Sequence, residues 1–287
     1  MTLSYDNPDL AARADQGRHD WWRYLLTVLW GFVIQVVLVV ILFVGLIVTG
    51  TPASTLITAA KDPAQPLWFF GMVGLSFAAW LIGVGSGARI FNKKPVRDYL
   101  AGWQWWLFFA GAAVWLAVTA GDAGLDYVLK PSGFTLKASL TPAIIAITGL
   151  GIAIQTFTEE FIFRGFATQG FLHLTKRPLP AAVLSGLIFG ALHIPNGWLQ
   201  AANAAVLGVV LALVAIRTGN LAFGYGLHLV NNLFGALIVV SADDVFKGAP
   251  GLFVQSTPSL DGVDLAVSVA GLVVLALVFG LRPRRPL

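Results

Sequence analysis

Cysteine is absent from the 287 residues. The chain therefore has no disulfide, thiolate metal site, iron–sulfur cluster or thiol nucleophile. Charged residues are also scarce, at 11%, whereas hydrophobic residues make up 57%. Disordered chains have the opposite composition, and soluble domains carry charge on about a quarter of their residues. Together with a mean hydropathy of +0.80, this composition predicts a single membrane domain over residues 1–287.

Long apolar runs recur along the chain, and a run of about 20 residues can cross a bilayer. The predicted fold class is all-α: a polytopic membrane bundle of about eight transmembrane helices that encloses a polar cavity. The runs lie at residues 24–49, 67–91, 103–121, 141–160, 181–194, 198–216, 221–240 and 263–281. The run at 181–194 is short, so we expect it to span only partly or to tilt. Two stretches rich in turn residues, 122–140 and 241–262, are expected to be outer loops.

Lysine and arginine are distributed unevenly between the two predicted sides. With the N-terminus inside, the inner segments hold 14 of the 18 basic residues, Arg164 among them, and the outer loops hold Lys61, Lys130, Lys137 and Lys247. The positive-inside rule then predicts that both termini are cytoplasmic, and we expect a bacterial cytoplasmic membrane. These charges also explain the pI near 9.5, so no nucleic-acid partner is needed to account for it.

The chain has only two glutamates, and they are adjacent at the end of an apolar run, Glu159 and Glu160. An ionised residue deep in a span costs about 2.5–3.5 kcal/mol and is a functional-site hypothesis by default. Glu160 and Arg164 have the i,i+4 spacing of a helical ion pair. Glu159 lies about 100° away around the helix, so it can face a cavity as a general base. The alternative is a pair in the headgroup region, where the cost largely vanishes.

Four histidines are present, in two different settings. His19 is expected to be solvated, and His173 to be interfacial beside a basic turn. His193 ends one apolar run and His228 lies inside another. Either of these two alone is explained as a hydrogen-bonded packing residue. Their occurrence with a carboxylate pair on three separate apolar helices favours a shared site.

Asparagines extend this set, because Asn231 and Asn232 follow His228 at i+3 and i+4. Both offsets fall near the same helix face, so spacing does not choose between them. A carboxylate and an imidazole can activate water, and imidazole and amide donors can stabilise an oxyanion. Two histidines and a glutamate are also common zinc ligands. Spacing decides neither chemistry, although an H-E-x-x-H motif is absent because neither glutamate follows a histidine.

Three short motifs occur in order along these helices. TEEFIFRG at 158–165 has the form E-E-x-x-x-R, FGALH at 189–193 the form F-x-x-x-H, and HLVNN at 228–232 the form H-x-x-x-N. This set resembles the CPBP family, which comprises CAAX prenyl endopeptidases of type II and related bacterial bacteriocin-processing proteins. The resemblance covers roughly residues 141–240, which we interpret as the catalytic core.

The resemblance implies an eight-helix bundle around a membrane-embedded cavity. It also implies four catalytic residues, Glu159, His193, His228 and Asn232. The first two would activate water and the last two would form the oxyanion hole, with Glu160 and Arg164 in support. The resemblance favours Asn232 over Asn231. Family members have been described both as metalloproteases and as metal-free glutamate proteases. We expect no metal or other cofactor, since metal ligation would block the donor role of His228.

The leading hypothesis is an intramembrane endopeptidase that cleaves near the cytoplasmic face. Its partners would be the lipid bilayer and membrane-associated or lipidated protein or peptide substrates, with no nucleic acid. A non-catalytic membrane binding or immunity protein of the same fold is an alternative. A proton- or ion-coupled transporter is a third, although no internal repeat of the kind found in many transporters is evident.

Overall fold

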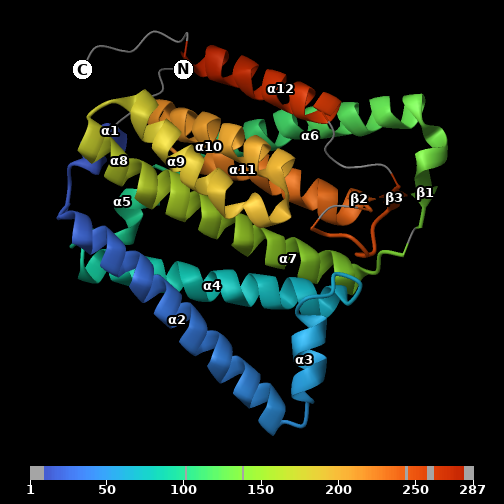
Figure 1. The fold of residues 1–287 in the computed structure, drawn as a ribbon. Coiled ribbons are helices and arrows are strands. Elements are labelled where there is room, and N and C mark those ends of the chain that lie inside the picture. The colour runs from blue at the N-terminus through green and yellow to red at the C-terminus, as the bar shows by residue number, and fades with distance from the viewer. Residues whose placement is uncertain (1–9, 101, 138, 243–244, 257–261, 281–287) are drawn as a thin grey trace.

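The computed structural model describes residues 10–100, 102–137, 139–242, 245–256 and 262–280, and within them it is a bundle of helices (Figure 1). The long helices in its first half are α2 (Trp21–Val48), α4 (Pro66–Ile90) and α6 (Trp105–Leu129). The second half contains α7 (Pro142–Glu159), α8 (Thr168–Thr175), α9 (Pro178–Leu192), α10 (Trp198–Thr218), α11 (Ala222–Leu233) and α12 (Gly262–Gly280). Short helices α1 (Leu10–Ala14), α3 (Ala53–Ala59) and α5 (Val96–Leu100) link or flank them.

The apolar helices of the described residues coincide with the eight predicted runs. Five are long and apolar enough to cross a membrane: Trp21–Val48, Pro66–Ile90, Trp105–Leu129, Pro142–Thr175 and Trp198–Thr218. Three are shorter: Pro178–Leu192, Ala222–Ile238 and Gly262–Leu275. The structure is therefore a helical membrane bundle, and its number of complete crossings stays a prediction.

Two predicted helices end later in the structure than the sequence predicts, so those two predicted ends are wrong. Helix α6 continues to Leu129, through the first part of the expected loop at 122–140, because its acidic side chains there face other polar groups, as Asp126 does towards Gln255. The run at 141–160 continues as an eight-residue π-helix, Glu160–Ala167, and then as α8 to Thr175. The end at residue 160 was expected because charges follow it. Those charges instead neutralise one another inside the bundle, as described below.

A small sheet lies at one end of the bundle (Figure 1) and has no counterpart in the predictions. Strand β1 (Phe134–Leu136) pairs antiparallel with β3 (Phe253–Gln255), which pairs in parallel with β2 (Val239–Ser241). The expected outer loop at 241–262 therefore contains β3. The final residues of the run at 221–240 likewise leave the α-helix, through a π-turn at Phe234–Ile238 into β2.

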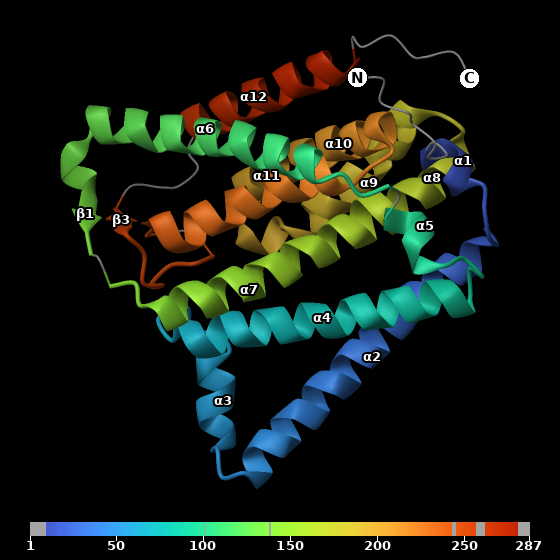
Figure 2. The same ribbon diagram turned by 180° about the vertical axis from the view of Figure 1, so that it is seen from behind.

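The helices are arranged around α7, α10 and α11. Helix α10 packs against α9 and α12, α11 against α6 and α7, and α4 lies between α7 and α2. Figures 1 and 2 show α2 at the periphery, diverging from α4 towards α3. Helix α2 has only two buried residues, Thr27 and Gly31, and its other side chains are largely apolar. A lipid-facing position accounts for that composition.

At the end of the bundle near α1, a buried lysine contacts the three helices α1, α5 and α8. Lys94 is 2% exposed and donates hydrogen bonds to the Arg13 carbonyl oxygen and to Oε1 of Gln169. Its ammonium also lies 4.7 Å from the centre of the Tyr99 ring. Burial lowers the pKa of Lys94 to about 8. Nearby, His19 is not simply solvated as expected, because its ring stacks on that of His173 at 3.7 Å.

Small residues allow the central helices to approach closely. A Cβ atom added to Gly186 or Gly190 of α9 would lie within 2.8 Å of α10 backbone atoms, which fits the small-xxx-small spacing of the pair. The α6–α11 contact is closer still. A Cβ on Gly111 would lie 2.2 Å from the Phe223 carbonyl oxygen, and one on Gly226 would lie 2.1 Å from that of Phe108.

We predict that Gly111→Ala lowers the stability of the protein, because the new methyl group must push α6 away from α11. Overpacking of this kind costs about 1–3 kcal/mol. The matched control is Gly121→Ala in the same helix, where a Cβ meets nothing within 4 Å and helix propensity favours alanine. Thermal unfolding of both variants in the same detergent measures the difference. Equal melting temperatures would contradict the assigned α6–α11 contact.

Candidate active site

The helix that carries both glutamates changes its winding where they occur. Glu159 is the last residue of α7, and Glu160 begins the π-helix. Insertions of this kind inside α-helices occur frequently at functional sites. Glu160, Arg164 and Glu159 are 1%, 0% and 8% exposed, so all three charged groups lie inside the bundle.

Glu160 and Arg164 form the ion pair that their spacing predicts. Nη1 of Arg164 lies 3.2 Å from Oε1 of Glu160, and the guanidinium carbon lies 4.3 Å from the centre of the Phe189 ring. An aromatic face attracts a cation more strongly when both are desolvated. Arg164 was counted among the inner-loop charges, and this assignment is wrong, because its charge is neutralised within the bundle.

His228 of α11 lies between the two carboxylates. Its Nδ1 is 2.9 Å from Oε1 of Glu160, and its Nε2 is 3.5 Å from Oε2 of Glu159. Gly224, one turn earlier, makes room for this contact, since a Cβ there would lie 2.9 Å from Oε2 of Glu160. The Glu160 carboxylate can accept the Nδ1 proton, so Nε2 is directed towards Glu159.

His193 lies where α9 ends and α10 is about to begin. Its Nδ1 is 2.7 Å from the Phe189 carbonyl oxygen. A carbonyl oxygen only accepts, so Nδ1 carries the proton and Nε2 of the neutral ring is left as an acceptor. Phe189 thus serves two residues, because its carbonyl orients His193 and its ring covers Arg164.

The asparagines belong to a chain of amide hydrogen bonds. Trp115 donates to Oδ1 of Asn231 at 2.9 Å, and Asn231 donates to Oδ1 of Asn232 at 3.0 Å. Asn232 in turn donates to Oε1 of Gln155 at 3.0 Å and to the Thr156 hydroxyl at 3.2 Å. Asn232 must therefore exchange a protein partner for a substrate oxygen if it is to stabilise an oxyanion.

A cavity of about 390 Å³ brings these residues together. Its lining includes all four predicted catalytic residues, Glu159, His193, His228 and Asn232. Glu160 and Arg164 are outside the lining, in keeping with a supporting position. Sequence reasoning missed the other polar residues of the wall, among them Gln155, Asn196, Gln200, Asn203, Asp122, Asp126 and Asp264. For Gln155 a signal was present, because it precedes Glu159 by four residues and so shares its helix face.

The described residues contain no group of three or more histidine, cysteine, aspartate or glutamate side chains placed to hold a metal ion. The three groups that lie close together, Glu159, Glu160 and His228, are engaged with one another and with Arg164. Glu159 nevertheless lines the polar cavity. A carboxylate in that position can take a proton from water.

Comparison with known proteins agrees with the motifs. Residues 140–234 match the family model described as type II CAAX prenyl endopeptidase Rce1-like, and all three motifs lie within that segment. This segment belongs to the CPBP family. The CPBP match supports a protease of the intramembrane CAAX kind.

Similarity to one relative extends well beyond the CPBP segment. The uncharacterized protein YyaK of Bacillus subtilis (strain 168) is 27% identical over 269 residues, which cover 84% of this chain and 85% of YyaK. No solved structure matches the chain.

We predict that Arg164→Met destabilises the protein by about 3–5 kcal/mol, because it leaves Glu160 buried beside no cation except His228. The double variant Glu160→Gln with Arg164→Met removes both charges and should lose less stability than Arg164→Met alone. Thermal unfolding of the wild type, both single variants and the double variant closes the cycle. A double variant as unstable as the sum of the two single variants would show that the ion pair contributes no coupling.

Proposed function

We propose that the protein is an intramembrane endopeptidase that hydrolyses peptide bonds of membrane-associated or lipidated protein substrates with a water molecule activated by Glu159 and His193. The single observation that carries this proposal is the placement of Glu159. Its side chain is 8% exposed and lines a polar cavity together with His193, His228 and Asn232, whereas Glu160 is outside the cavity lining.

In the proposed reaction Glu159 and Nε2 of His193 orient a water molecule in the cavity. Glu159 takes a proton from this water as its oxygen attacks the carbonyl carbon of the scissile bond. The resulting oxyanion accepts hydrogen bonds from Nε2–H of His228 and from the Asn232 amide. The proton held by Glu159 passes to the leaving nitrogen as the carbon–nitrogen bond breaks, which regenerates the carboxylate.

Glu160 and Arg164 act through His228 in this mechanism. With Glu160 bound to Nδ1, the His228 ring keeps one orientation, and Nε2 is presented to the cavity side. When the ring is protonated, both nitrogens donate. Glu160 and Arg164 are thus positioning residues, and they need not touch the substrate.

We predict that Glu159→Gln abolishes proteolysis while preserving the fold, because the amide keeps the shape and lacks a basic oxygen. Loss of a general base typically costs about 10²–10⁴ in rate. The measurement compares protein N-termini across the membrane proteome of cells carrying the wild type or Glu159→Gln at matched abundance. Termini that appear only with the wild type would identify substrates.

A matched control variant and a separate flux assay make this comparison specific. Glu160→Gln changes the neighbouring glutamate by the same atoms, and we expect it to reduce cleavage and stability together, because it loosens both Arg164 and His228. Identical N-termini with wild type and Glu159→Gln, combined with an unchanged phenotype, would favour a non-catalytic binding or immunity protein. Ion flux through liposomes that depends on Glu159 would favour a transporter.

We also propose that the reaction needs no metal. Support comes from the paired state of Glu160 and His228, whose Nδ1 is occupied by the carboxylate. We predict that strong zinc chelators leave cleavage of a peptide spanning an identified site unchanged. Purified active protein should contain less than one equivalent of bound zinc. Activity lost on chelation and restored by zinc would overturn this proposal without affecting the proteolytic one.

A further inference from the structure

The cavity extends from the glutamates towards only one end of the bundle. In α6 its lining residues lie between Trp115 and Asp126, in the half nearer β1. In α10 they lie between Gln200 and Leu207, and in α12 between Asp264 and Ser268, which are the first halves of those helices. Gln255 of β3 also contributes. The cavity therefore leads from mid-bundle to the end that carries the small sheet.

The turn between α9 and α10 contributes to this opening. Helix α9 has 15 residues, which at 1.5 Å per residue give about 22 Å, less than the thickness of a hydrocarbon core. Its last turn leads to His193, and Asn196 and Gln200 beyond it also line the cavity. The wall formed by α9 therefore stops at the level of His193, and polar groups follow it.

Towards the opposite end, buried side chains close the bundle. Arg164, Phe161 and Tyr99 are each no more than 2% exposed, and Lys94 is hydrogen-bonded to Gln169 beyond them. Among the described residues, no residue of α1, α5 or α8 lines the cavity. A substrate that reaches Glu159 from that end would have to displace a well-packed aromatic layer and a buried ion pair.

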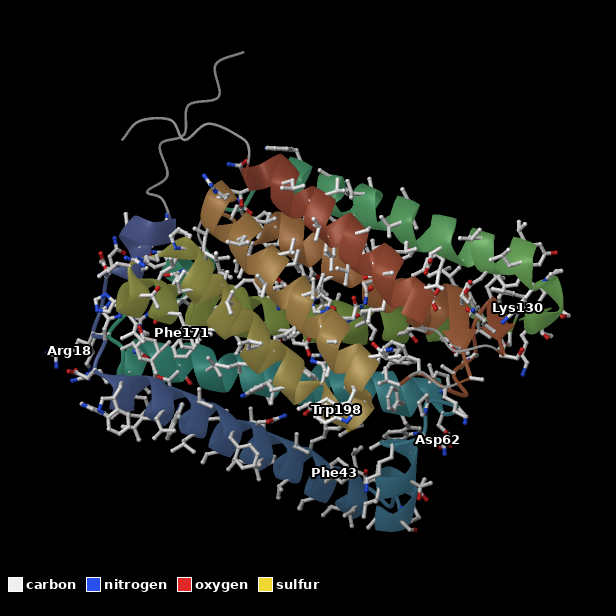
Figure 3. All side chains as sticks on the ribbon, turned by 45° about the horizontal axis from the view of Figure 1, so that its top comes forward. Arg18, Phe43, Asp62, Lys130, Phe171 and Trp198 are labelled. Carbon is white, nitrogen blue, oxygen red and sulfur yellow. The ribbon has the colours of Figure 1, made fainter. Side chains whose placement is uncertain are left out.

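The two ends, which Figure 3 marks with Arg18 and Lys130, also differ in their number of basic residues. The described basic residues at the end near α1 are Arg13, Arg18, Arg23, Arg89, Lys93, Lys94, Arg97, Lys176, Arg177 and Arg217. Those at the sheet end are Lys61, Lys130, Lys137 and Lys247. Basic residues near spans remain in the cytoplasm, so the end near α1 is cytoplasmic and the cavity opens on the other side.

We propose that the active-site cavity is entered from the extracytoplasmic side of the membrane, and that the substrates are outward-facing polypeptide segments of membrane or exported proteins. The substrate part of this inference rests on the proposed proteolytic function. A prenylated C-terminus lies on the cytoplasmic side, so it does not have access to this cavity. This inference also replaces the expectation from sequence that cleavage occurs near the cytoplasmic face.

The absence of cysteine allows a direct test with single-cysteine variants. Ser268→Cys and Asn203→Cys place a thiol in the cavity wall. Lys130→Cys is the control at the sheet end, and Arg97→Cys, whose native side chain is 87% exposed, is the control at the other end. Intact cells are treated with a permanently cationic, membrane-impermeant methanethiosulfonate, which the aspartates of the cavity do not repel. Remaining thiols are then mass-tagged after denaturation.

In intact cells, we expect the reagent to block later tagging of Ser268→Cys, Asn203→Cys and Lys130→Cys. We expect it to block tagging of Arg97→Cys only in inverted vesicles. Protection of the two cavity variants in inverted vesicles alone would overturn the inference. Labelling does not require activity, so the same sidedness should be seen when Glu159→Gln is added. The N-terminal comparison then separates the two proposals. New protein N-termini that depend on the wild type but lie only in cytoplasmic segments would contradict the extracytoplasmic substrate and leave the proteolytic function intact. Labelling of the cavity cysteines from outside without any new N-termini would contradict the proteolytic function alone.

Discussion

The burial of one arginine in the middle of the bundle is the constraint on which the active-site region depends. An unpaired charge there would cost several kcal/mol, and Arg164 is fully buried. Its compensation comes from Glu160 at 3.2 Å and from the face of Phe189. With these charges neutralised, one helical segment continues from Pro142 to Thr175 instead of ending at the glutamates. Its π-helical part places Glu159 and Glu160 in different surroundings.

The geometry of the candidate active site depends on this ion pair. Glu160 also binds Nδ1 of His228 and so brings α11 to the glutamate-bearing helix. Phe189, held over Arg164, uses its carbonyl group to orient His193. Three motifs on three helices are thus joined by contacts that centre on the pair, and Glu159 is the carboxylate of the two that lines the cavity. Stability and catalytic placement depend on the same few atoms, so substitutions at Glu160 should affect both.

Local periodicity explains which features could be predicted from the sequence. The apolar runs and the Glu160–Arg164 pairing depend on residues within one or two helical turns, and both are found in the structure. The three-residue strands are too short to show an alternating pattern, and β1 pairs with β3 from more than a hundred residues away. The hydrogen-bonded chain from Trp115 through Asn231 and Asn232 to Gln155 joins three helices, so no local pattern indicates it. The walls of the cavity could likewise not be predicted locally, because they include residues of α6, α10 and α12, which are far apart in the sequence.

The side of the membrane on which the cavity opens depends on segments outside the catalytic motifs. The CPBP match begins at residue 140, after α2, α4 and α6. The direction in which α7 crosses is set by the number of crossings before it and by their flanking basic residues. One crossing more or fewer before α7 would make the cavity face the opposite side of the membrane without changing any motif residue. Similarity to the family over residues 140–234 therefore predicts the chemistry of Glu159 and its neighbours, whereas the side of the membrane that the cavity faces depends on the segments before them and their charges.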